Sequence, residues 1–137
     1  KKNIKIKNNS LVQEFIDAKE NGILRDTRIV FLGDEPQYAL SRIAKQGSFH
    51  TNFHQGAIVE FLEIMELEVL LQLSKKISEP LKIFDKRIYS LDFMFDTRSQ
   101  KYYLIEMNTK PGLDVFDNNS VNELKAYLLN LTKYIIN

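Results

Sequence analysis

Residues 87–108 read RIYSLDFMFDTRSQKYYLIEMN, and this stretch decides the fold. Two runs rich in aromatic and apolar residues, 87–96 and 101–108, flank the polar segment 97–100. This pattern is typical of two antiparallel strands joined by a short turn. We therefore predict a β-hairpin. Because side chains alternate along a strand, each strand has two distinct faces.

One face of this hairpin gathers oxygen-bearing side chains. Asp92 lies opposite or diagonal to Glu106, and Asn108 follows on the same face. Neighbouring carboxylates repel, and a hard divalent cation removes that cost while taking oxygen ligands from Asp, Glu and Asn. Asp92, Glu106 and Asn108 are therefore candidate ligands of Mg²⁺, or of Mn²⁺. The alternative is a solvated strand face whose acids are neutralised by nearby lysines.

Apolar residues complete the prediction for this hairpin. Leu104 shares the otherwise polar face, as expected for the floor of a cleft that holds a flat ring, although a single exposed leucine is common. The opposite face is predicted to pack on helices, and it holds Leu91, Phe93, Phe95, Tyr103, Ile105 and Met107.

The rest of the chain predicts further strands and two helices. Strands are expected at 11–16, 25–32, 37–43 and 57–64, with a turn at 33–36, and helices at 65–78 and after the capping box that begins at Ser120. The predicted fold class is α+β, an antiparallel sheet with helices packed on one face.

A pair of arginines is expected on the first hairpin. With its turn at 33–36, Arg28 falls roughly opposite Arg42. Like charges in that position are unfavourable unless an anion lies between them, and arginine binds phosphate or carboxylate with two parallel hydrogen bonds. The alternative is that each arginine pairs with an acid such as Asp26 or Glu60.

The segment 49–56 contains both histidines of the chain. His50 and His54 are four residues apart, but no third zinc ligand follows from the spacing. Asn52, beside a glycine-containing loop, is a candidate for hydrogen bonding to a phosphate or an acyl group.

Composition restricts the class of protein. The chain has 137 residues, a net charge of +1 and no cysteine, and these numbers favour one domain that binds neither nucleic acid nor membrane. The sequence contains no long apolar run, so a cytoplasmic location is expected. Residues 1–10 are expected to form a loosely ordered basic lead-in, and 11–137 the folded domain.

Several motifs, in this order, resemble the ATP-grasp family. They are DTRIVFLGDE at 26–35, RIAK at 42–45, FHTN at 49–52 and EMNTKPG at 106–112. LVQEFI at 11–16 resembles the hinge strand of the family. The likeness is to the glutamate-adding ligases that modify ribosomal protein and to glutathione-synthetase-like enzymes.

The resemblance implies a C-terminal ATP-grasp subdomain and a role for each matching residue. Asp92, Glu106 and Asn108 would bind Mg²⁺, while Arg28, Arg42 and Asn52 would lie near the transferring phosphoryl group. The adenine of ATP would contact Gln13, Glu14, Phe15 and Ile16 of the hinge and Leu104 beneath them. The implied reaction joins a carboxylate to an amine through an acyl phosphate.

The same resemblance implies a partner lobe. The family's N-terminal lobe, which also grips ATP, would precede residue 11, so the chain is expected to be a fragment, and oligomers are possible. His50, Gln55 and Ala57 depart from the family pattern and leave the substrates open. The alternatives are a module that binds an anion or a partner chain without catalysis, and a plain structural domain.

Overall fold

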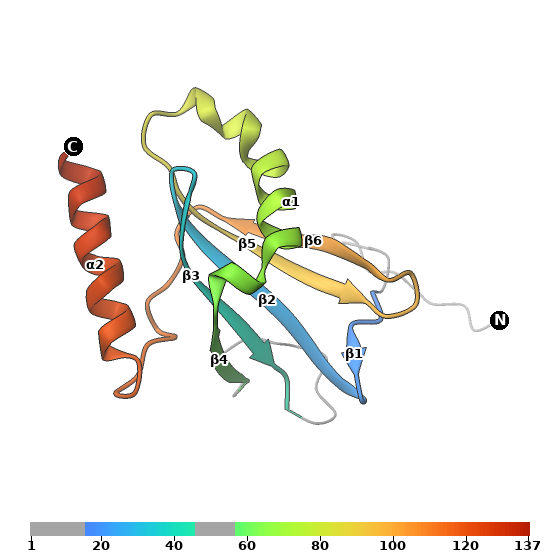
Figure 1. Cartoon of the computed structure of the whole chain (residues 1–137). Coiled ribbons are helices and arrows are strands. Elements are labelled where there is room, and N and C mark those ends of the chain that lie inside the picture. The colour runs from blue at the N-terminus through green and yellow to red at the C-terminus, as the bar shows by residue number, and fades with distance from the viewer. Residues whose placement is uncertain (1–15, 46–56) are drawn as a thin grey trace, which may run out of the picture.

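A computed structural model describes residues 16–45 and 57–137. It contains a six-stranded antiparallel sheet with the order β4-β3-β2-β5-β6, and β1 pairs separately with β2 (Figure 1). The strands are β1 (Lys19–Glu20), β2 (Ile23–Leu32), β3 (Glu35–Ile43), β4 (Ile58–Leu62), β5 (Ile88–Asp96) and β6 (Lys101–Asn108). The predicted α+β class with an antiparallel sheet is confirmed.

Both predicted hairpins form, with turns suited to their residues. Gly33 adopts φ +62°, which glycine tolerates at no steric cost, and the strands pair as far as Leu32 and Glu35. In the β5–β6 turn the backbone N–H of Gln100 donates to the carbonyl of Asp96 at 2.9 Å. The hairpin that decides the fold therefore has the two strands and the turn that its sequence predicts.

The helical segments also lie where they are expected. A short 3₁₀ turn, η2 (Ile64–Glu66), precedes α1 (Glu68–Ser78), and a second, η3 (Glu79–Ile83), takes up Pro80 at its start. The chain ends in α2 (Val121–Ile136). Within the described ranges, no helix is both long enough and apolar enough to cross a bilayer.

The two helices pack against opposite faces of the sheet, whereas the sequence analysis placed helices on one face. Leu70 of α1 packs with Ile29 and Phe93, while Tyr127 of α2 packs with Val30 and Leu40. Neighbouring residues of β2 point to opposite faces, so the helices do too. Figure 1 shows α1 across the sheet and α2 beside the end that holds the β2–β3 turn. Periodicity identifies the apolar side of a helix but not the sheet face that receives it.

The capping box predicted at the start of α2 is wrong. The Ser120 hydroxyl makes no capping hydrogen bond to the helix, and instead donates to the Asp117 carboxylate at 3.0 Å. That carboxylate also accepts from the backbone N–H groups of Asn119 and Ser120. These hydrogen bonds, led by the one from the Asn119 N–H, lower the pKa of Asp117. The turn before the helix is thus organised by Asp117.

Two predicted apolar surfaces are only partly covered. On α2, Leu131 packs into the core beside Tyr127, but Leu128 and Ile135 are exposed. On the hairpin, Tyr103, Ile105 and Met107 are exposed rather than packed on helices. Met107 lies on the edge strand β6, whereas α1 packs on the central strands. Tyr103 pairs with Met94 and so lies on the face away from α1, contrary to the prediction.

Candidate functional site

Asp92 lies at the centre of the candidate site. On β5 it pairs with Arg28 of β2 on one side and with Glu106 of β6 on the other. The Nε and Nη2 atoms of Arg28 donate to the two carboxylate oxygens of Asp92, each at 2.7 Å. Such two-pronged pairs are among the strongest hydrogen-bonded ion pairs in proteins. The pair brings together two predicted residues that are 64 positions apart.

Arg42 extends this pair into a longer chain of charges. Its Nη2 atom donates to Asp92 Oδ2 at 2.7 Å and to Asp26 Oδ2 at 2.7 Å, and its Nε atom donates to Asp26 Oδ1 at 2.8 Å. Asp26, Arg42 and Asp92 are 4%, 6% and 2% exposed. We call Asp26–Arg42–Asp92–Arg28 the ion-pair chain. Acidic and basic side chains alternate along it, so each buried charge has a neighbour of opposite sign that offsets its desolvation cost.

The predicted register of the first hairpin is wrong. Arg28 lies opposite Leu40, and Arg42 lies opposite Asp26. The turn is shorter than the expected 33–36, because the strands pair up to Leu32 and Glu35, with a bulge after Val30. The alternative raised from the sequence, an arginine paired with Asp26, describes Arg42. The two arginines converge on Asp92 rather than on each other.

The three candidate metal ligands share one face of the sheet. Asp92 pairs directly with Glu106, the first of the two predicted arrangements, and Asn108 pairs with Ser90, two residues along β5. Glu106 is exposed and Asn108 is half-buried. Among the described residues no three His, Cys, Asp or Glu side chains form a metal-binding group, so the third ligand would be the Asn108 amide oxygen.

This set fits a hard divalent cation. All three donors are oxygens, which Mg²⁺ prefers. The buried hydroxyl of Ser90, beside Asn108, has no hydrogen-bond partner within the described part of the chain, so an oxygen atom is also available there. The carboxylate of Asp92, however, already accepts three hydrogen bonds from arginines. A cation at Asp92 would therefore share a carboxylate whose Oδ1 accepts one of these hydrogen bonds and whose Oδ2 accepts two.

Leu104 does not lie on this face, contrary to the prediction. A bulge follows Asp92, so Asp92 pairs with Glu106 but Phe93 pairs with Leu104. Cross-strand partners share a face, which assigns Leu104 to the α1 side with Phe93. The extra residue is Ile105, which the sequence analysis assigned to the other face. The regular alternation of side chains along a strand, on which the prediction was based, does not indicate where a bulge occurs.

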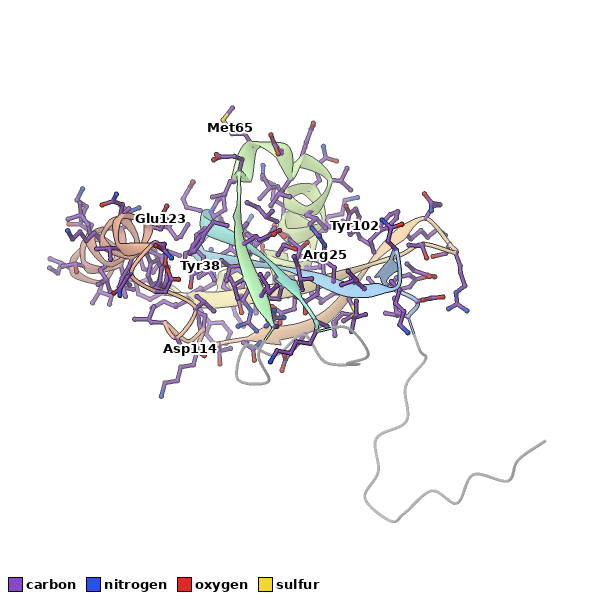
Figure 2. The ribbon with its side chains drawn as sticks, turned by 90° about the horizontal axis from the view of Figure 1, so that it is seen from below. Arg25, Tyr38, Met65, Tyr102, Asp114 and Glu123 are labelled. Carbon is purple, nitrogen blue, oxygen red and sulfur yellow. The ribbon has the colours of Figure 1, made fainter. Side chains whose placement is uncertain are left out.

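The ion-pair chain is bordered by apolar clusters on its own face. At one end Ile16 and Met94 pack around Ala18, Leu24 and Ala44. The cluster at the other end contains Tyr38, Leu40, Val115, Phe116 and Tyr127. In Figure 2 the labelled Tyr38 and Glu123 lie toward α2, and Arg25 and Tyr102 lie toward the other end. The charged side chains of the ion-pair chain are therefore surrounded largely by apolar residues.

Burial and neighbouring charges fix the protonation states of Arg42 and Tyr38. Burial opposes the charge of Arg42, but hydrogen bonds and Coulomb attraction from Asp26 and Asp92 outweigh it and raise the pKa of Arg42. Burial, and then the neighbouring Tyr127, raise the pKa of Tyr38, although Arg28 opposes this shift. Arg42 therefore stays charged and Tyr38 stays neutral near neutral pH.

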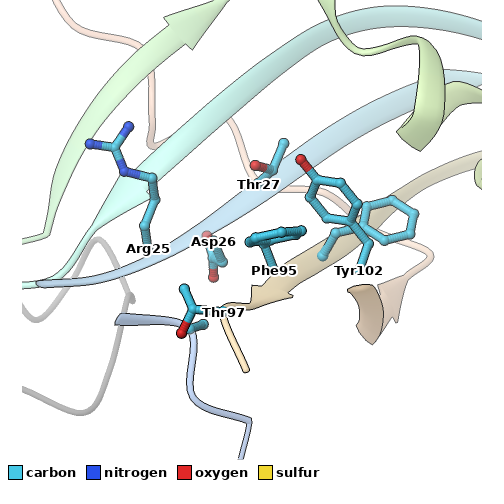
Figure 3. A pocket seen from close by; sticks show the side chains of 8 residues that line it. Arg25, Asp26, Thr27, Phe95, Thr97 and Tyr102 are labelled. Atoms are coloured by element: carbon cyan, nitrogen blue, oxygen red, sulfur yellow. The ribbon is translucent and has the colours of Figure 1, made fainter. Parts of the chain in front are cut away.

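A cavity of about 270 Å³ reaches one end of the ion-pair chain, at Asp26, and is also bordered by Phe93 of the cluster that packs on α1 (Figure 3). It is lined by Ala18, Arg25, Asp26, Thr27, Phe93, Phe95, Thr97 and Tyr102. In Figure 3 Phe95 and Tyr102 lie side by side, and their ring centroids are 4.9 Å apart. None of the predicted site residues that the structure describes lines this cavity.

Some predictions lie outside the described residues. These are Gln13, Glu14 and Phe15 of the hinge, Asn52, both histidines, Gln55 and the lead-in 1–10. Of the predicted hinge only Ile16 is described, and its carbonyl accepts from the N–H of Ala18 at 3.0 Å. Asp26 is predicted from the sequence only as a counter-charge for an arginine.

The chain is similar in sequence to proteins that are named as glutamate ligases. The chain is 34% identical, over 125 residues, to a coenzyme gamma-F420-2:alpha-L-glutamate ligase of Methanocaldococcus jannaschii, a match that covers 90% of this chain and 40% of the relative. It is 30% identical, over 104 residues, to a probable alpha-L-glutamate ligase of Enterobacter sp. strain 638, covering 76% of this chain and 31% of the relative. The chain thus spans less than half the length of these relatives.

The family assignment rests on a longer match. The RimK-like ATP-grasp domain matches residues 2–132, nearly the whole chain. The α+β fold and the acidic hairpin agree with the resemblance seen in the sequence. This chain belongs to the RimK-like ATP-grasp family.

Proposed function

We propose that the chain forms the metal- and phosphate-facing part of a ligase that uses ATP to join a carboxylate to an amine. One observation carries the proposal. The Asp92–Glu106 pair, with Asn108 beside it, lies on the same sheet face as the converging guanidinium groups of Arg28 and Arg42. This arrangement supports the proposal, because a metal-bound nucleotide needs oxygen ligands for the cation and hydrogen-bond donors for the anion.

The proposed chemistry needs no nucleophilic side chain. A substrate carboxylate oxygen attacks the γ-phosphorus of ATP and ADP leaves. The amine nitrogen then attacks the acyl carbon, loses its proton, and inorganic phosphate leaves. Negative charge gathers on the transferring group, and Arg28 and Arg42 would neutralise it. Asp92, Glu106 and Asn108 would hold Mg²⁺, which supplies further neutralisation when bound.

Further parts of the proposal rest on the family. Asn52 would contact the transferring phosphoryl group, and residues 13–16 would contact adenine. The relatives are named glutamate ligases, so glutamate is the amino acid that we propose is joined. A second lobe would close over the nucleotide from the opposite side. Because each match covers 40% or less of its relative, the relatives' length leaves room for such a lobe.

Calorimetric titration with ADP and Mg²⁺ tests this function. We expect Mg²⁺-dependent ADP binding that Asp92→Asn abolishes. Asp96→Asn is the matched control, because Asp96 lies on the same strand and its carboxylate accepts from the N–H of Arg98. This control should bind like the parent chain.

Two results would contradict the proposal. If Asp92→Asn binds Mg²⁺ and ADP as well as the parent chain does, the metal assignment is wrong. If ADP binds without Mg²⁺ and only arginine substitutions weaken it, the face is an anion-binding module rather than part of a ligase.

A further inference from the structure

Two arginines of the ion-pair chain donate to Asp92, the same carboxylate that is a candidate metal ligand. Both oxygens of Asp92 accept hydrogen bonds from Arg28, and Oδ2 accepts a third from Arg42. We propose that Arg28 and a divalent cation compete for the Asp92 carboxylate, and that Asp26 is a positioning residue that restrains Arg42 from competing as strongly. This inference rests on the metal site proposed above.

Arg28 is the arginine that a cation would release. Its two side-chain hydrogen bonds among the described residues both go to Asp92, through Nε and Nη2. A cation that takes the Asp92 oxygens therefore frees the whole donor edge of the guanidinium. That edge suits a phosphate or carboxylate group, which it can bind with two parallel hydrogen bonds.

Arg42 responds differently because Asp26 holds it. Two of its three hydrogen bonds in this chain of charges, from Nε and Nη2, go to Asp26, and only Nη2 also reaches Asp92. Both Asp26 and Arg42 are buried. When a cation occupies Asp92, Arg42 keeps its two bonds to Asp26 and stays in place. Without the Asp26 charge, Arg42 would turn more fully to Asp92.

The arrangement therefore couples cation to anion. A bound cation removes the partner of Arg28, which leaves the guanidinium ready for an anion. A bound anion that engages Arg28 in turn frees Asp92 for the cation. By thermodynamic reciprocity each ligand should raise the affinity for the other.

Mn²⁺ binding to the full 137-residue chain, followed by the electron paramagnetic resonance signal of free Mn²⁺, tests this inference. Arg28→Met should bind Mn²⁺ more tightly, by about tenfold, which lies within the usual range of coupling between ligands. Asp26→Asn should bind it more weakly than the parent chain. Inorganic phosphate should strengthen Mn²⁺ binding in the parent chain but not in Arg28→Met.

The matched control is Arg25→Met. Arg25 lies on the same strand, three residues from Arg28 and so on the opposite face, and it is about half exposed. Its removal changes the net charge equally. Arg28→Met should still fold, because Arg42 continues to neutralise Asp92. If thermal unfolding shows otherwise, Arg28→Lys replaces it. Lysine keeps the charge but cannot donate from two planar nitrogens, so Mn²⁺ affinity should rise by a smaller factor.

The possible outcomes separate the two proposals. If Asp92→Asn loses Mn²⁺ binding but Arg28→Met binds no more tightly than Arg25→Met, the metal site stands and the competition is refuted. If Asp92→Asn retains Mn²⁺ binding, or if no variant binds Mn²⁺, the metal site fails and the competition fails with it.

Discussion

At the scale of the residue, Asp92 shows why a buried carboxylate needs several partners. It is 2% exposed, and it would carry a large desolvation cost without its arginines. Three hydrogen bonds from two guanidinium groups offset that cost. Polar residues in the centre of a sheet thus stabilise one another, and removing one weakens the pairing of its neighbours.

Arg42→Met tests this account of stability. We expect a loss of about 3 kcal/mol in the free energy of unfolding, because Asp26 loses its two-pronged partner and Asp92 loses one donor. Urea denaturation measures the change. The control is Lys82→Met, which removes a Lys82–Glu79 pair of the same 2.7 Å length at the surface and should change little. Similar losses for both variants would contradict a special role for burial.

At the scale of the element, two short irregularities decide how the strands present their side chains. The tight β2–β3 turn sets Arg42 opposite Asp26, and the bulge after Asp92 assigns Leu104 to the α1 side. A shift of one residue reverses the face of every side chain that follows. The hairpins were therefore predictable, while their exact pairing was not.

The β2–β3 turn gives a prediction with an internal control. Gly33 and Gly22 both have positive φ, but a Cβ at Gly33 would lie 3.3 Å from the Tyr134 ring, whereas one at Gly22 would meet nothing within 4 Å. Each change to alanine should cost about 1–2 kcal/mol for the left-handed backbone. Gly33→Ala should cost more than Gly22→Ala, because Tyr134 must also move. Guanidinium denaturation compares the two variants. Equal losses in the free energy of unfolding would show that the Tyr134 ring moves aside without cost.

At the scale of the whole molecule, apolar side chains remain exposed away from the core. Leu129 and Ile136 of α2 are 57% and 77% exposed, and β6 also carries exposed apolar residues along a sheet edge. Exposed apolar patches and open strand edges favour association.

Lysine substitutions on α2 test this expectation. Leu129→Lys together with Ile136→Lys should reduce concentration-dependent association in sedimentation velocity without lowering the melting temperature. Leu131→Lys is the contrasting variant. Leu131 packs against the Tyr127 cluster, so a lysine charge there should lower the stability of the protein. An unchanged association constant in the double variant would show that α2 does not mediate self-association.

The sequence by itself determined the family, the strand hairpins and the nearness of Asp92 to Glu106, because these depend on local alternation and on the order of short motifs along the chain. Only the tertiary structure decided that Arg28 and Arg42 converge on Asp92. That meeting requires β5 to pair with β2, across 64 positions of sequence, and no local pattern specifies it. The physical reason is that alternation fixes the face of a side chain, while partners on that face depend on strand order and register.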